Sequence, residues 1–190
     1  MLFRSVGLLA DFTKSATLAF KAAGEAILVI GETHGWLGQS VYLRDICHRE
    51  EGAPPPVDLT AEKRNGDVVR GMIHAGTATS VHDVSDGGLL IALAEMAMAG
   101  HIGAVLDAAP AATLPHAYWF GEDQARYIVT VAQADLLGVM TKLRAVEVPC
   151  VQIGLTGGDS IAIEGEQAVH VAHLRSAHER WLPAYMAAKG

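Results

Sequence analysis

The stretch SVHDVSDGGLLIALAEMAMAG, residues 80–100, places the most polar cluster of the chain directly before its most apolar segment. A histidine, two aspartates and a serine precede the paired glycines Gly87 and Gly88, and Glu95 is the one charged residue in the run that follows. This composition predicts a helix from Gly88 that ends at Gly100 and is buried on more than one side. Burial would hold the first turn of this helix rigidly in place.

The start of such a helix has two physical interpretations. A helix start exposes unpaired N–H groups and the positive end of the helix dipole, and Gly87 and Gly88 would let an anion approach the backbone closely. Ser85 could then donate to a phosphate, while Asp83 and Asp86 would repel a bare phosphate but suit one that carries magnesium, ribose hydroxyls or a substrate amine. In the structural interpretation, Asp86 only caps the helix and Ser85 only closes a turn.

Strands alternate with helices along the rest of the chain. The run 26–31 is short, β-branched and ended by glycine, which is typical of a buried strand, and GAPPP at 52–56 is a rigid linker. Further strands are predicted over 79–83, 103–108, 125–132, 149–155, 160–165 and 168–174, with a late hairpin around a Gly-Gly-Asp turn. Helices are predicted over 39–48, 59–75, 134–147 and 174–188, with a short helix or turn over 110–123.

Local signals refine these elements. Asp58 or Thr60 is placed to cap the helix that stops at Gly76, and Pro183 is expected to interrupt the last helix. The inward positions of the first helix are predicted to be Val41, Leu43, Ile46 and Cys47. The order of elements predicts a mixed α/β (α+β) layered sandwich with flanking helices, and not a doubly wound βαβ repeat.

Composition excludes several classes of function. The chain has 190 residues, 51 % of them apolar, and a net charge of -7, which argues against disorder, nucleic acid and an anionic membrane as partner. Its two cysteines, Cys47 and Cys150, lie far apart, so we expect reduced thiols and no structural zinc site. No stretch is long enough to span a bilayer, and the opening apolar run is too short for a signal peptide. We therefore expect a cytoplasmic protein.

The stretch HDVSDGG resembles a signature of phosphoribosylformylglycinamidine synthase, the purine-pathway enzyme also called formylglycinamide ribonucleotide amidotransferase. An ordered series of further matches runs from about Val6 to the C-terminus, whereas MLFRS has no counterpart. The matching segments are residues 31–43, 54–59, 82–88, 120–126 and 154–159. The chain departs from the family pattern at Gln39, Val41, Asp123 and Ala125, where the family usually has glycine, glutamate, serine and glycine.

The resemblance implies a fold, a reaction and a set of partners. Family members carry two copies of an ATP-binding domain, each with a partner domain, and this chain resembles only the last partner domain, shared with aminoimidazole ribonucleotide synthetase. Residues 1–24 would then be an arm from an ATP-binding domain, and residues 25–190 the domain itself. The whole enzyme converts formylglycinamide ribonucleotide, ATP and glutamine-derived ammonia to formylglycinamidine ribonucleotide, using magnesium. The small form of the enzyme receives ammonia from a separate glutaminase subunit and a small bridging subunit.

The resemblance also ranks the site residues. The family's catalytic histidine and its main nucleotide and magnesium ligands lie outside the matched part, so no residue here is predicted to be catalytic and no metal ligand is assigned. The predicted contacts to substrate or nucleotide are, in order, Asp83, Ser85, Asp86, Gly87 and Gly88, then Glu122, Gln124 and Arg126, then Glu32 and Thr33. Arg126 could pair a phosphate bidentately, or form a salt bridge to Glu122 or Asp123.

Two alternatives remain open. The first is another enzyme with this domain, such as aminoimidazole ribonucleotide synthetase, selenophosphate synthetase or thiamine-monophosphate kinase. The second is a non-catalytic binding module, because the positive mean hydropathy of +0.26 suggests an apolar face that docks elsewhere. In either case we expect the isolated chain to be inactive or to self-associate, with a homodimer as one outcome.

Overall fold

The structure is a computed structural model that describes residues 7–188, so the unmatched opening MLFRS lies outside the described residues. Its strands are β1 (Ala26–Ile30), β2 (Ser80–Asp83), β3 (Ala104–Leu106), β4 (Tyr127–Val131), β5 (Cys150–Thr156), β6 (Ser160–Ile163) and β7 (Val169–His170). Its helices are α1 (Leu59–Ala75), α2 (Gly88–Gly100), α3 (Pro115–Phe120), α4 (Gln133–Ala145) and α5 (Val171–Ala187), with a π-helical turn, η1, at Tyr42–Ile46.

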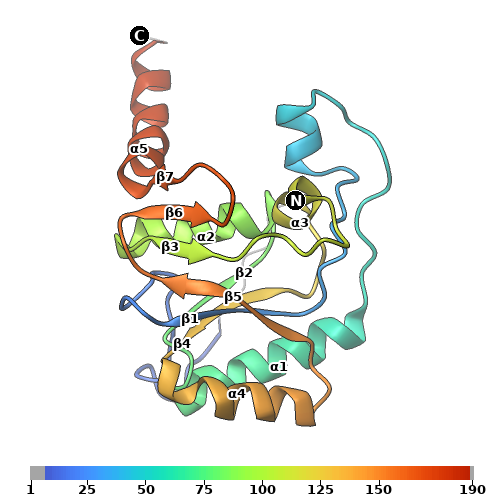
Figure 1. Ribbon diagram of the computed structural model, residues 1–190, viewed down its shortest axis with the longest axis vertical. Helices are drawn as coiled ribbons and strands as arrows, with labels where there is room; N and C mark the ends of the chain where they lie inside the picture. The colour runs from blue at the N-terminus through green and yellow to red at the C-terminus, as the bar shows by residue number, and fades with distance from the viewer. Residues whose placement is uncertain (1–6, 189–190) are drawn as a thin grey trace.

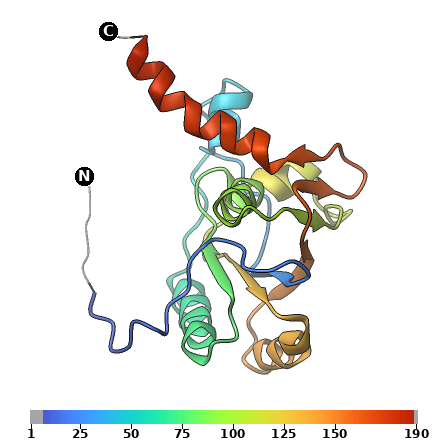
Figure 2. The same cartoon turned by 90° about the vertical axis from the view of Figure 1, so that its left-hand side faces the viewer.

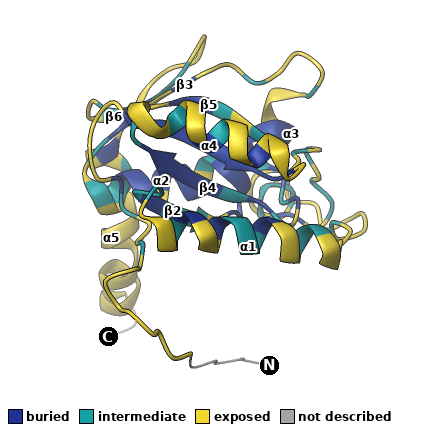
Figure 3. Ribbon diagram, turned by 90° about the horizontal axis from the view of Figure 1, so that it is seen from below, coloured by how far each residue is buried: buried dark blue, intermediate teal, exposed yellow. Residues whose placement is uncertain are grey.

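The strands form one mixed sheet in the order β2-β4-β1-β5-β3-β6-β7. Neighbouring strands are antiparallel except β3 and β6, which are parallel. Helices α1 and α4 cover one face of the sheet, and α2 lies against the other face near α3 and the start of α5 (Figures 1 and 3). The predicted α/β layered sandwich is therefore confirmed.

Strand β1 is the centre of this sandwich because both of its faces are buried. Ala26, Leu28 and Ile30 belong to the apolar cluster under α1 and α4. Ile27 and Val29 belong to the cluster that contains α2 and α3. Successive side chains of a strand point to opposite faces of the sheet, so a strand with both faces covered is apolar at every position. This explains the sequence AILVI.

Helix α1 begins and ends at its predicted residues. Asp58 is the N-cap, because one carboxylate oxygen accepts hydrogen bonds from the backbone N–H groups of Thr60 and Ala61 at 2.8 and 3.1 Å. Gly76 closes the helix in the left-handed conformation with φ at 70°. Of the two predicted caps, Asp58 is therefore correct and Thr60 is wrong.

The chain before β1 holds no helix or strand over residues 7–25, but its last part is attached to the domain. The N–H of Phe20 donates to the carbonyl of Met96 at 3.3 Å, and the Phe20 ring is buried in the α2 cluster. Helix α2 ends at Gly100, as predicted, and His101 is its C-cap in the left-handed conformation. A Cβ at Gly100 would lie 2.4 Å from the Phe20 carbonyl oxygen, so the arm is the reason for glycine there.

Four sequence predictions are wrong, each for a local reason. The segment 39–48 forms only the turn η1, in which no residue is buried and Ile46 is 67 % exposed. The late hairpin does not form, because β3 lies between β5 and β6. The segment 168–174 alternates like a strand, but α5 begins at Val171. Pro183 lies inside α5 and does not interrupt it.

Cys150 supports a prediction about thiol chemistry. Its thiol lies 3.6 Å from the sulfur of Met140, and burial raises the pKa of Cys150 to about 12. Because the thiolate is the reactive form, iodoacetamide should alkylate Cys150 in the folded protein far more slowly than Cys47, which directly follows the η1 turn. Mass spectrometry of a labelling time course would measure both rates. Equal alkylation rates of Cys150 and Cys47 in native buffer would contradict this prediction.

No helix among the described residues is long and apolar enough to cross a membrane.

Candidate functional site

Three loops that are far apart in sequence meet at one end of the sheet, and they are the three loops that the sequence predicts to bind ligand. They follow β1 (residues 31–41), follow β2 (residues 84–87) and precede β4 (residues 121–126). The carboxylate of Glu122 joins all three, since its Oε1 accepts from the backbone N–H groups of Val41 and Gly87, both at 2.8 Å. We call this arrangement the loop cluster.

Glu122 sits at the start of α2, where the sequence predicts an anion. The N-cap is Gly87, with φ at 82°, and its N–H is taken by Glu122. The N–H of Gly88 donates to the Ser85 carbonyl at 3.1 Å, closing a turn. A carboxylate near a helix N-terminus is favourable, so an internal carboxylate supplies the negative charge there. Asp86 is not the cap, because no side chain caps α2.

Asp123 organises the loop after β1. Its Oδ2 accepts from the backbone N–H groups of His34 and Gly35 at 3.2 and 2.9 Å, and its Oδ1 accepts from that of Trp36 at 3.1 Å. Three successive N–H groups that converge on one anion form a nest. Sequence reasoning noted Asp123 as a departure from the family and as a possible partner of Arg126, but it missed this role.

Arg126 lies beneath the loop cluster and is 2 % exposed. Its Nε and Nη2 donate to the carbonyls of Asp123 and Gly121 at 3.0 and 2.6 Å. Its Nη1 donates to Thr33 Oγ1 at 3.2 Å and lies 3.7 Å from Asp123 Oδ2. Burial lowers the pKa of this guanidinium, and the charge of Asp123 opposes that effect. Arg126 and Thr33 therefore support the loops from inside the protein. The salt bridge of Arg126 is to Asp123 and not to Glu122.

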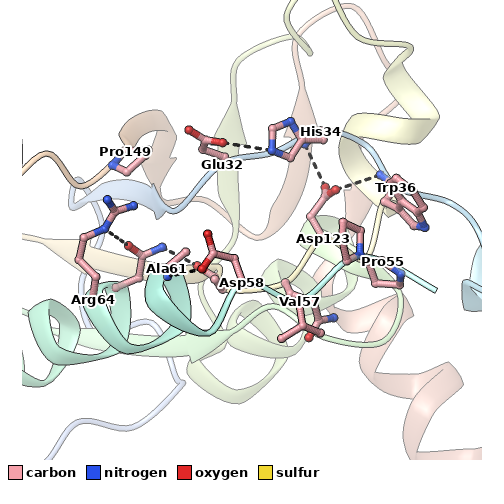
Figure 4. A pocket seen from close by; sticks show the side chains of 14 residues that line it. Glu32, His34, Trp36, Pro55, Val57, Asp58, Ala61, Arg64, Asp123 and Pro149 are labelled. Carbon is pink, nitrogen blue, oxygen red and sulfur yellow. Dashed lines mark hydrogen bonds and ion pairs between the residues drawn. The ribbon is translucent and has the colours of Figure 1, made fainter. Parts of the chain in front are cut away.

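A groove of about 500 Å³ opens beside the loop cluster (Figure 4). Glu32 and Gln124 line it, together with His34, Asp58 and Arg64. The exposed carboxylate of Glu32 pairs with His34 Nε2 at 3.1 Å, from the same loop. Nothing in the sequence marked Arg64, which comes from the first half of α1.

The polar side chains just before α2 do not line this groove. Asp83, Ser85 and Asp86 are exposed, and Asp83 lines a separate depression beside Tyr127. His82 bridges two acids there, with Nδ1 3.2 Å from Asp83 Oδ1 and Nε2 2.7 Å from Glu95 Oε2. The structure therefore brings the predicted loops together, but it distributes their side chains over two surfaces.

The described residues form no complete metal site. Within residues 7–188, no group of three or more histidine, cysteine, aspartate or glutamate side chains is placed to hold a metal ion. Glu122 and Asp123 already accept backbone hydrogen bonds. Magnesium that bridges substrate phosphates uses only one or two carboxylates, so exposed acids such as Asp83 or Asp86 fit a contributing role and not a full coordination shell.

Most of the chain matches the model of a known family. The model of the AIR synthase related protein, C-terminal domain, matches residues 22–165. The chain belongs to this family. The match includes the strands from β1 to β6, while α5 lies beyond it.

Comparisons with individual proteins are more specific. The chain is 79 % identical, over 97 % of its length, to phosphoribosylformylglycinamidine synthase subunit PurL of Rhodopseudomonas palustris strain BisA53, and 78 % identical to that of Nitrobacter hamburgensis. It spans 25 % of the length of each relative. The resemblance noted from the sequence is therefore confirmed at the level of family.

Solved structures show the same fold. The chain resembles Thermotoga maritima PurL complexed with FGAR with a TM-score of 0.72 and 16 % identity, over 86 % of this chain and 30 % of that one. It resembles thiamine-monophosphate kinase from Stenotrophomonas maltophilia K279a with a TM-score of 0.54 and 19 % identity, over 80 % of this chain and 54 % of that one. At these identities the likeness concerns the fold alone.

Proposed function

We propose that the chain acts as a domain of a phosphoribosylformylglycinamidine synthase subunit, and that the loop cluster forms one wall of a substrate or nucleotide site. The observation that carries this proposal is the near-complete match to relatives of that name at 72–79 % identity. The convergence of three predicted loops through Glu122 supports the position of the site. The alternative of a kinase or another synthetase has only a distant likeness of fold in its favour.

The chemistry of the loop cluster suits polar, neutral parts of a ligand. When bound, ATP with magnesium would activate the amide oxygen of formylglycinamide ribonucleotide for displacement by ammonia. Glu32 and Gln124 offer an acceptor and a donor on the groove wall, and Asp83 and Asp86 offer acceptors beside α2. Ribose hydroxyls and amide or amine N–H groups are the partners that such side chains bind. We assign no catalytic residue to this chain.

The proposal extends to partners outside the chain. Because the chain spans a quarter of its relatives, ATP and magnesium would be bound mainly by ATP-binding domains that precede it in a longer protein. A separate glutaminase subunit and a small bridging subunit would supply ammonia to that assembly. A purine-pathway enzyme of this kind would work in the cytoplasm.

Calorimetric titration with formylglycinamide ribonucleotide and with magnesium-ADP would test the proposed wall. We expect one of the two ligands to bind the chain weakly, and Asp86→Ala to raise its Kd by about tenfold, the effect of losing a hydrogen bond to a charged group. Asp135→Ala removes an exposed carboxylate from α4 and should leave the Kd unchanged.

Each outcome has a defined meaning. Binding of the substrate alone, or of the nucleotide alone, would identify which site the wall serves. Binding of neither ligand, or equal affinity of the wild type and Asp86→Ala, would contradict the proposed wall. Turnover by the chain alone would contradict the proposal that ATP is bound by other domains.

A further inference from the structure

Helix α5 continues its buried face into solvent. Val171 and Leu174, at its start, pack in the cluster with α2. The same helical stripe, with steps of three and four residues, continues through His178 to Trp181 and Tyr185. Figures 1 and 2 show that this second half leaves the body of the domain. This stripe, which we call the seam, is packed in the domain at its start and carries the exposed ring of Trp181 farther along.

The seam ends in large apolar side chains, whose exposure to water is unfavourable. Trp181 is 66 % exposed and stacks on Tyr185, with ring centroids 5.4 Å apart, and Leu182 and Met186 flank them at 56 and 63 %. Contiguous apolar patches of this kind mark interaction sites. The family match ends at residue 165, so these side chains lie outside it. We call Trp181, Leu182, Tyr185 and Met186 the α5 tip.

An apolar groove of about 670 Å³ lies beside the base of α5. Leu90 and Ile91 of α2 and Trp119 of α3 line one side of it, and Leu174 of α5 lines its edge. The volume lies in the range of pockets that enclose a drug-sized ligand, so the groove has room for an indole ring and a neighbouring leucine. The segment after β6 contributes two acids, Glu164 and Glu166, to the same groove.

The α5 tip cannot reach the groove of its own molecule. Val171 and Leu174 fix the start of the helix against the domain, and α5 is unbroken to Ala187. Trp181 follows Val171 by ten residues, which at about 1.5 Å per residue is about 15 Å along the axis. A straight helix therefore carries the tip away from the groove that lies at its base.

We propose that two copies of the chain form a symmetric dimer in which the α5 tip of each copy fills the apolar groove of the other. Each copy contributes one tip and one groove, so the two contacts are equivalent, as a two-fold interface requires. Charge supports this occupant, because Arg180 directly precedes the tip while Glu164 and Glu166 line the receiving groove. Trp181 would be the buried aromatic anchor, with Arg180 paired at the rim.

Sedimentation velocity over a concentration series tests the dimer on the full chain. We expect a reversible monomer–dimer equilibrium, and Trp181→Ala should raise the dissociation constant at least about tenfold, as expected for an anchor residue. Leu137→Ala is the matched control, since Leu137 is 79 % exposed on α4, which covers the other face of the sheet. That variant should dimerise like the wild type, and circular dichroism should show both variants folded.

A charge exchange tests the pairing of tip and groove. Glu166→Arg or Arg180→Glu alone should weaken the dimer, whereas the double variant should recover much of the wild-type affinity, because the opposite charges are restored. A chain that stays monomeric at every concentration would overturn the proposal and leave the tip to a different partner. A dimer that is insensitive to Trp181→Ala, or a double variant weaker than both single variants, would overturn it as well.

Discussion

Replacing Gly88 with alanine should destabilise the domain by roughly 3 kcal/mol, combining backbone strain with an overpacked contact. Gly88 has φ at +72°, a conformation that residues with a side chain rarely adopt. A Cβ there would lie 2.6 Å from the carbonyl oxygen of Gly121 and 2.7 Å from the carbonyl carbon of Phe120. These are backbone atoms, so relief requires moving α2 away from the loop that carries Glu122. Urea unfolding followed by circular dichroism would measure the loss.

Gly138→Ala provides the matched control for this prediction. Gly138 lies inside α4, and a Cβ built on it meets nothing within 4 Å. Alanine there should therefore stabilise the protein by about 0.5–1 kcal/mol, the ordinary gain within a helix. If Gly88→Ala were as stable as the wild type, the close packing of α2 against the loop cluster would be wrong.

Asp123→Ala should cost the domain about 3–5 kcal/mol, the effect of leaving a buried charge without its partner. The substitution removes the acceptor of three backbone N–H groups and the nearest anion to the buried guanidinium of Arg126. The loop after β1 would lose its anchor, so we also expect faster amide hydrogen exchange at residues 34–36. Asp135→Ala, on the surface of α4, should cost less than about 1 kcal/mol, because it loses only a helix-dipole contact.

A double-mutant cycle separates the two effects of Asp123. If its main role is to compensate the charge of Arg126, then Asp123→Ala combined with Arg126→Met should cost clearly less than the sum of the single losses. If its main role is to hold the N–H groups of the loop, the losses should add. A stability of Asp123→Ala within about 0.5 kcal/mol of the wild type would contradict both roles, since only surface changes are that small.

The elements that the sequence predicts well are those with local causes. Asp58 and Gly76 mark the ends of α1 through a side-chain cap and a left-handed residue, and both signals act within a few residues. The apolar run of β1 follows from burial on both faces. Because local signals of this kind mark the strands and helices, the layered fold was predictable as well.

The elements that the sequence predicts badly depend on distant partners. The period of two in 168–174 is real, but α5 begins at Val171, where the domain offers α2 as a packing surface. The hairpin of β5 and β6 was expected from a short turn, yet β3, made some fifty residues earlier, pairs with both. The order of strands is a property of the whole sheet, and a short stretch of sequence does not determine it.

The site divides in the same way. Its loops could be predicted, because HDVSDGG and the segment around Glu122 resemble a known family, and the structure brings both together with the loop after β1. The direction of each side chain could not be predicted. Arg126 is buried, and Asp123 holds a nest of N–H groups contributed by residues almost ninety positions earlier in the chain.

The central position of β1 also sets the order in which this protein can assemble during synthesis. β1 is synthesised before both of its neighbours, because β4 and β5 end only at residues 131 and 156. Until then its apolar run has no strand to pair with, and contacts this distant in sequence form slowly. The nascent chain thus carries an unprotected, aggregation-prone strand until those neighbours have been made, and the loop cluster closes only when β4 has formed.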